Sequence, residues 1–328
     1  MAYIRKYRDK WRAEVERNGV RKSQLFPTKT AAQQWAAGEE TKLLKEAKTG
    51  RRDISFKEAL LRYVNEVSVN KRGKRFEELR IQAFIRDFPS LAKKQITDVE
   101  TPDFVTWRDA RLKVVSRGTV LRDLKLFSNF FIIALNEWKL MDANPLIGLR
   151  RPRDNPPRKR LVNWREIKLV CRSLGYVSNK QPVLKIQEVA LAFLIALRTG
   201  MRAGEVLQLN QTTVDFKTSI ALVSHKMEYI TGSLRVVPMQ RQALRLIKLI
   251  PKDGFTVSSA SLDALFRKTT SRLLIEDLHF HDSRATALTR LTKKVDVMTL
   301  AKISGHKDLN ILLNTYYRET AEDIARRL

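Results

Sequence analysis

Six side chains in the C-terminal half of the chain are of types that can bind a phosphate group and attack it. They lie in the stretches TGMRAGEVLQL (199–209), HFHDSRATALTRL (279–291) and ISGHKDLNILLNTYYRE (303–319), with one lysine between the first two. The set consists of Arg202, Lys226, His281, Arg284, His306 and one of the tyrosines Tyr316 and Tyr317. Planar guanidinium groups bind two phosphate oxygens at once, and a cage of cations stabilises a pentacoordinate transition state. A tyrosine can be a covalent nucleophile, and a lysine or histidine can protonate a leaving oxygen.

The local pattern relates two of the boxes to helices. Arg202 lies between a glycine turn at Gly200 and a short apolar helix, and Glu205 lies one helical turn further on. His281 and Arg284 are three positions apart, so they share one face of a helix.

The histidines also raise the possibility of a metal site. The four are His225, His279, His281 and His306. His279 and His281 are alternate residues, but no acidic cluster lies close enough in the sequence to complete a ligand shell. The single cysteine, Cys171, excludes an intramolecular disulfide and a zinc site built from cysteines. We therefore predict no metal and no cofactor, and the sequence shows no P-loop glycine pattern.

The charge balance indicates the class of partner. The formal net charge is +28, from 63 Lys and Arg against 35 Asp and Glu. An excess of this size repels itself in the folded state, which favours a polyanionic partner, with nucleic acid first and an anionic membrane surface second. No run of about 18 apolar residues predicts a transmembrane helix, and the basic N-terminus lacks the apolar region of a secretory signal. We expect a cytoplasmic protein that works on DNA.

A small sheet and a helix are predicted at the N-terminus. WRAEVERNGVRKSQLF contains two strands joined at Asn18-Gly19, a strong hairpin signal, within a sheet over residues 3–26. Thr28 or Thr30 can cap the helix that follows. Its predicted inward face consists of Ala32, Trp35, Ala36 and Leu43. Because its strands carry many cations, residues 1–50 are predicted to form a small DNA-binding module.

The rest of the chain is predicted to be mostly helical. After a linker at 49–55, helical spacing extends over 56–148, including a long helix with Val120, Leu124, Phe127, Phe131 and Leu135 facing inward. Residues 149–160 belong to a Pro- and Arg-rich stretch, which predicts an extended basic linker. In 161–328, β-rich runs at Ser219–Val223 and Leu234–Met239 predict a small sheet among helices.

Clusters of cations on the predicted outer surfaces are our candidate DNA contacts. They are Arg5, Lys6, Arg8, Arg12, Arg21, Lys22, Lys71, Arg72, Lys74, Arg75, Arg117, Arg122, Lys125, Arg158, Lys159 and Arg160.

The three stretches, in this order and at these separations, resemble the boxes of the tyrosine recombinases, specifically the phage and prophage integrases. The resemblance implies that Arg202, His281, Arg284 and His306 bind the scissile phosphate, that Lys226 is the lysine of a β-hairpin, and that Glu205 supports the first box. It also implies a mostly helical protein with small β-sheets. Its parts would be an arm-type DNA-binding module (1–50), a helical core-site DNA-binding domain (56–148) and a mixed α/β catalytic domain (161–328).

The position of the nucleophile departs from the family pattern. The nucleophile usually lies nine positions after the box histidine, which is Thr315 here, and a one-residue insertion makes it Tyr316. Because the motif usually reads Tyr-x-His and Arg318 stands in the place of that histidine, we choose Tyr316 and keep Tyr317 as the alternative nucleophile.

The implied reaction forms a 3′-phosphotyrosine, frees a 5′-hydroxyl and proceeds through a Holliday junction. It would integrate and excise a mobile element. The implied partners are double-stranded DNA with core and arm sites, a homotetramer on that DNA, and DNA-bending and directionality factors. Two alternatives stay open, a type IB topoisomerase-like strand transferase and a noncatalytic DNA-binding regulator.

Overall fold

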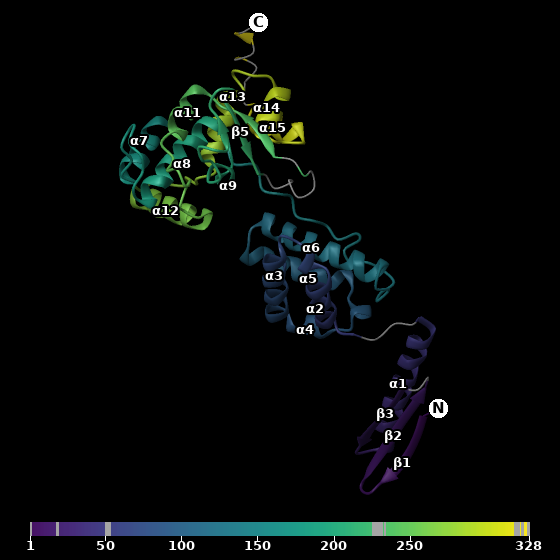
Figure 1. Ribbon diagram of the computed structural model, residues 1–328. Coiled ribbons are helices and arrows are strands. Elements are labelled where there is room, and N and C mark those ends of the chain that lie inside the picture. Colours follow the sequence, from purple (N-terminus) through teal and green to yellow (C-terminus); the bar gives the residue numbers. More distant parts are fainter. Residues whose placement is uncertain are drawn as a thin grey trace. The chain divides into compact units, whose positions relative to one another are not determined.

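The computed structural model describes residues 2–17, 20–49, 54–224, 232, 234–317, 322, 325 and 326. The chain divides into two compact units, Met1–Pro156 and Pro157–Leu328 (Figure 1). The boundary between them falls inside the predicted basic linker, and residues 149–163 contain neither helix nor strand. No helix in the described part of the chain is long and apolar enough to cross a membrane.

The first unit begins with a three-stranded antiparallel sheet covered by one helix. The strands are β1 (Ala2–Tyr7), β2 (Lys10–Arg17) and β3 (Val20–Phe26), and the helix is α1 (Lys29–Thr49). The predicted hairpin is confirmed, since Arg17 pairs with Val20, while β1 is a further strand on the other side of β2. Ala13, Val15, Ala32 and Ala36 form a small core that partly buries Trp35. The Thr28 hydroxyl accepts the Ala31 N–H at 3.2 Å, whereas the predicted turn Asn18-Gly19 and the side chain of Leu43 lie outside the described residues.

A helical bundle makes up the remainder of this unit, as predicted. Its helices are α2 (Phe56–Glu66), α3 (Lys74–Asp87), α4 (Pro89–Lys93), α5 (Thr101–Val114) and α6 (Arg117–Asn136). Phe56 lies at the centre of the core, with its ring within 6.4 Å of five other phenylalanine rings, counted between centroids. The residues predicted to face inward on α6 are buried, except that Leu135 is only partly so. The bundle begins at Phe56, as predicted, and Ser55 caps α2 in a capping box with Glu58.

The second unit surrounds a buried central helix. Its helices are α7 (Trp164–Ser173), α8 (Lys185–Thr199), α9 (Ala203–Val206), α11 (Arg241–Ile247), α12 (Ser259–Arg272), α13 (Asp282–Leu291), α14 (Val297–Ser304) and α15 (Leu309–Thr315). Apolar residues occur all round α8, and the helix packs against α7, α11, α12 and α13. A small sheet, β4 (Val214–Asp215), β5 (Ile220–Val223) and β6 (Arg235–Pro238), lies in the order β4-β5-β6. The predicted small sheet is therefore confirmed, with Val223 opposite Arg235.

A glycine ends α8 immediately before the first of the sequence-predicted site residues. Gly200 has a φ of +69°, and a Cβ added there would lie 2.8 Å from Leu288 Cδ2 in the packed helix α13. The close packing of α8 on α13 thus depends on the missing side chain. Gly204, four residues later, has no atom within 4 Å of an added Cβ.

We expect Gly200→Ala to lower the free energy of unfolding by about 1–3 kcal/mol, from backbone strain and the clash with Leu288. Gly204→Ala is the matched control and should change it by less than about 1 kcal/mol, since alanine is favoured in a helix. Urea unfolding of the two variants measures both values. Equal losses in the two variants would contradict the packing argument.

Candidate active site

Glu205 is a buried carboxylate that holds Arg202 in place. Its side chain is 5% exposed, and it accepts the backbone N–H of Arg202 at 2.8 Å and a guanidinium N–H of Arg202 at 3.0 Å. Glu205 thereby caps the start of the short helix α9, and its own backbone N–H donates to the Arg202 carbonyl at 2.9 Å. The Arg202 guanidinium keeps 43% of its side-chain surface exposed, so it can also bind an incoming anion.

A second arginine, which the sequence analysis did not select, also binds Glu205. Arg235 at the start of β6 donates from Nη2 to Glu205 Oε2 at 2.7 Å and from Nη1 to the Ile303 carbonyl at 2.6 Å. Its side chain is 9% exposed, and its buried Nε–H has no hydrogen-bond partner among the described residues. Burial lowers the pKa of Arg235, against the effect of Glu205. Its partners lie 30 and 68 positions away in the chain, so the alternation of LRVVPM gave no signal for this role.

Arg284 is buried behind Arg202, where two helices end. It donates from Nη1 to the Gly200 carbonyl at 2.6 Å and from Nη2 to the Ser304 carbonyl at 2.8 Å. These are carbonyls at the C-terminal ends of α8 and α14, where partners are otherwise missing and the helix dipole is negative. Burial, followed by the charge of Arg202, lowers the pKa of Arg284 to about 10. Each terminal nitrogen carries two N–H groups, so these two bonds use only part of the donor set, and the phosphate contact expected for Arg284 stays a prediction.

Two histidines lie beside these arginines. His306 follows the left-handed turn at Gly305, and its Nδ1 lies 2.7 Å from Ser304 Oγ. Burial, followed by the charges of Arg284 and Arg202, lowers the pKa of His306 to about 4. His281 immediately precedes α13, and burial of part of its ring, followed by the charge of Arg284, also lowers its pKa. Both imidazoles are accordingly neutral at pH 7, and each offers one N–H donor and one acceptor.

The two adjacent tyrosines occupy different environments. Tyr316 immediately follows α15, is 6% exposed, and has its ring centroid 5.9 Å from that of His306. Tyr317 donates its hydroxyl to the Val295 carbonyl at 3.3 Å. Of the two phenols, Tyr316 is the one packed against a histidine of the site.

The structure thus brings together Arg202, Glu205, His281, Arg284, His306 and Tyr316. Lys226 and His225 lie outside the described residues. His279 is exposed, 4.0 Å from Asp277 and 3.9 Å from Asp282. Within the described ranges, no group of three or more His, Cys, Asp or Glu side chains could hold a metal ion.

The predicted DNA-contacting cations at the N-terminus surround one carboxylate. Glu14, on the sheet face opposite α1, is 2.8 Å from Arg12, 2.7 Å from Arg21 and 3.9 Å from Arg5. Lys22 pairs with Glu39 at 2.8 Å, while Lys6 and Arg8 are exposed. These ion pairs hold three guanidinium groups side by side on one open surface.

The cations of the bundle and the linker differ more in their surroundings. Exposed members are Arg72, Lys74, Arg75, Arg117, Arg122, Lys125 and Lys159. Lys71 is half-buried and donates to Tyr63 Oη at 2.7 Å and to Glu77, which gives it a structural role. Arg158 pairs with Asp277 and Asp282, and Arg160 pairs with Glu166.

Four arginines that the sequence analysis did not group together line one hollow. Arg117, Arg150, Arg151 and Arg153, with Pro152, line a pocket of about 560 Å³ in the first unit. The sequence predicts an extended basic linker here, but it does not show that the arginines gather around the first residue of α6.

Comparison with known proteins gives one consistent family. Residues 177–323 match the phage integrase family. A Haemophilus influenzae protein named as an integrase/recombinase is 35% identical over 300 residues, which cover 90% of this chain and 96% of the relative. A shufflon-specific DNA recombinase of Escherichia coli is 33% identical over 275 residues, covering 80% of this chain and 68% of the relative. A solved lambda integrase dimer bound to a COC′ core site shares the fold, with a TM-score of 0.66, 15% identity, and coverage of 97% of this chain and 96% of that chain.

The histidine environment predicts an unusual titration. We expect the His306 imidazole to titrate with a pKa of about 4 in ¹H–¹³C NMR spectra of the full chain. Because the folded-state pKa lies below the unfolded value, the unfolded chain binds the proton first as the pH falls. His306 should therefore lower the free energy of unfolding only between about pH 6.5 and pH 4. Arg202→Gln should raise this pKa by removing a nearby positive charge, whereas Arg272→Gln, on α12, should leave it unmoved. An ordinary pKa for His306 in the unaltered protein would contradict the assigned burial.

Proposed function

The chain belongs to the phage integrase family of tyrosine recombinases and is a site-specific DNA recombinase, and we propose that Tyr316 is its nucleophile. The observation that carries the proposal is the packing of the Tyr316 ring against His306, beside Arg284, whose charge interacts with both residues. The Tyr317 hydroxyl is hydrogen-bonded to a main-chain carbonyl, so Tyr317 is the less suitable nucleophile.

In the proposed first step, the Tyr316 oxygen attacks the scissile phosphorus and the bond from phosphorus to the 5′ oxygen breaks. This leaves a 3′-phosphotyrosine and a free 5′-hydroxyl. In the second step the 5′-hydroxyl of a partner strand attacks the phosphotyrosine and releases the tyrosine. One phosphate ester replaces another in each step, so no external energy source is needed.

The arginines have different parts in this scheme. The exposed guanidinium of Arg202 binds the non-bridging phosphate oxygens, in an orientation held by Glu205. Arg284 holds the ends of α8 and α14 with one N–H from each terminal nitrogen, and its positive charge and second N–H groups act on the phosphate. Arg235 is a positioning residue that ties Glu205 to the segment carrying His306.

The proton transfers fall to the neutral histidines and to the hairpin lysine. We assign His281 the uptake of the tyrosine proton, because its lowered pKa leaves the imidazole free to accept one at neutral pH. His306 donates a hydrogen bond to the phosphate from its Nε2, while its Nδ1 is held by Ser304. Lys226, carried over from the family pattern, protonates the leaving 5′ oxygen.

The DNA contacts are proposed on three surfaces. In the domain 1–50, the sheet face that carries Arg5, Arg12 and Arg21 would bind arm-type DNA sites. The exposed cations of the bundle (56–148) and the arginine hollow would bind the backbone of the core site. A solved lambda integrase tetramer is bound to a Holliday junction, and we propose a tetramer for this chain too, assisted by bending and directionality factors in a bacterial host cell.

The comparisons favour a recombinase over the two alternatives, since the named relatives are recombinases and integrases. A relaxing topoisomerase would cleave without pairing two specific duplexes. A noncatalytic regulator would bind DNA and form no covalent adduct.

Covalent trapping tests the nucleophile. With a nicked duplex built from the repeats that flank its gene, the unaltered protein should give a denaturant-resistant DNA–protein band, and Tyr316→Phe should abolish it. Tyr317→Phe is the matched control and should retain the band. Loss of the band only in Tyr317→Phe would move the nucleophile by one position, and bound DNA without any band would support the regulator.

The arginine hollow predicts a change in the salt dependence of DNA binding. Each phosphate contact contributes about 0.9 to the slope of log K against log salt. The double variant Arg151→Gln/Arg153→Gln should therefore reduce the slope by about two. Arg86→Gln, which removes an arginine paired with Asp87, is the control and should leave the slope unchanged. An unaltered slope in the double variant would remove the hollow from the DNA interface.

A further inference from the structure

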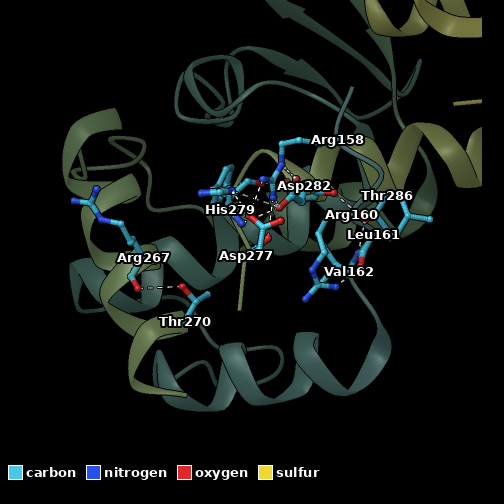
Figure 2. Close-up of polar contacts among 12 residues, drawn as sticks. Arg158, Arg160, Leu161, Val162, Arg267, Thr270, Asp277, His279, Asp282 and Thr286 are labelled. Atoms are coloured by element: carbon cyan, nitrogen blue, oxygen red, sulfur yellow. Dashed lines mark hydrogen bonds and ion pairs between the residues drawn. The ribbon is translucent and has the colours of Figure 1, made fainter. Parts of the chain in front are cut away.

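The end of the basic linker is attached to the helix that follows His281. Figure 2 shows Arg158 beside Asp277 and Asp282, with Val162 and Thr286 close by. All of these residues belong to the second unit, Pro157–Leu328. The attachment therefore lies within one compact body and does not depend on the placement of the first unit.

Arg158 binds two carboxylates at once. It reaches Asp282 from Nε at 3.2 Å and from Nη2 at 3.0 Å, and Asp277 Oδ1 from Nη1 at 2.7 Å. It also donates to the Asp277 carbonyl at 2.8 Å. Asp282, with a side chain only 3% exposed, accepts in addition the backbone N–H of His279 at 2.8 Å. A carboxylate so deeply buried requires a paired cation, and a bidentate arginine is the strongest such pair.

A second contact holds the same turn of α13. The Val162 N–H donates to Thr286 Oγ1 at 2.8 Å, and that hydroxyl donates to the Asp282 carbonyl at 2.8 Å. Arg158 and Val162 thus hold the first turn of α13 at both ends. Arg284 lies within that turn, and His281 immediately precedes it.

The pair also sets the charge around His281. The charges that act on its imidazole are Arg284, Arg202 and Arg158, which lower its pKa, and Asp282, which raises it. Arg158 therefore offsets the effect of Asp282 on His281. His279, Asp277 and Arg160 face the same cluster, since Arg160 also interacts with Asp277 and Asp282.

We infer that Arg158 is a positioning residue for His281: by holding Asp282 it fixes the first turn of α13 and keeps the neighbouring imidazole in place for the reaction. This differs from the phosphate contact that the sequence suggested for Arg158, because its guanidinium is already engaged by two carboxylates. The inference rests on the proposed function, in which His281 takes up a proton. It also means that the linker between the two units is fastened directly to the catalytic helix.

The test uses the full chain and two readouts. The chain has four histidines, so the His281 signal in ¹H–¹³C NMR spectra can be assigned by its loss in His281→Asn. The second readout is the pH dependence of the rate of adduct formation on the nicked duplex. The variants are Arg158→Gln, Arg158→Lys and Asp282→Asn. The control is Arg272→Gln, which removes an arginine that joins α12 to the Ser173 carbonyl.

In Arg158→Gln the pKa of His281 should rise by about 0.5–1 unit, because Asp282 is no longer offset. The acid limb of the rate profile should shift to higher pH by the same amount, which lowers the rate below that limb by about three- to tenfold. DNA affinity should not change. Arg158→Lys should restore part of the shift, since it keeps the charge without the bidentate geometry. Asp282→Asn should move the pKa of His281 downwards, and Arg272→Gln should leave it in place.

Opposite shifts in Arg158→Gln and Asp282→Asn are the signature of the inference. If both variants raise the pKa towards its ordinary value, the pair only keeps the region folded and the inference is wrong. If Arg158→Gln leaves the pKa unmoved but weakens DNA binding and reduces the salt slope by about one, Arg158 is a phosphate contact. An unaltered protein that forms no adduct would overturn the proposed function and this inference with it. If the unaltered protein forms the adduct but Arg158→Gln leaves the acid limb of the rate profile at the same pH, this inference alone is wrong.

Discussion

The site depends on one buried carboxylate among several arginines. Glu205 accepts hydrogen bonds from Arg202 and Arg235, and its charge also acts on Arg284. Without it, three guanidinium groups would lie close together in a largely buried space with no compensating charge, which is costly. With it, one arginine stays exposed towards a ligand while the others hold the surrounding helices. The same carboxylate thus permits a concentration of positive charge that an incoming phosphate can use.

That concentration of charge determines the state of the histidines. His281 and His306 lie in partly buried positions beside Arg284 and Arg202, so protonation would add a positive charge where several exist already. The imidazoles therefore remain neutral and able to exchange protons with a substrate. Tyr316 packs against His306 in the same cluster, which places its ring beside the charged groups of the site.

Buried carboxylates also bind arginines in two other places in the chain. Glu14 gathers three arginines on the N-terminal sheet, and Asp282 holds Arg158 at the end of the linker. In a chain with a net charge of +28, the few buried acids decide which cations face solvent and which hold the fold. The exposed cations supply the long-range attraction to DNA, and the paired ones supply position.

The sequence by itself determined the arginine, histidine and tyrosine boxes, the N-terminal hairpin and the mostly helical class. Each of these rests on residues that are close in the chain, where spacing and turn chemistry act directly. The tertiary structure decided what depends on distant partners. It brought Arg235 to Glu205 and Ile303, placed Tyr316 rather than Tyr317 against His306, and gathered Arg117 with Arg150, Arg151 and Arg153. It also paired Arg158 with a carboxylate 124 positions away. An arginine looks the same in a sequence whether it meets a phosphate or a buried acid, because only the folded chain sets which charge lies within hydrogen-bonding distance.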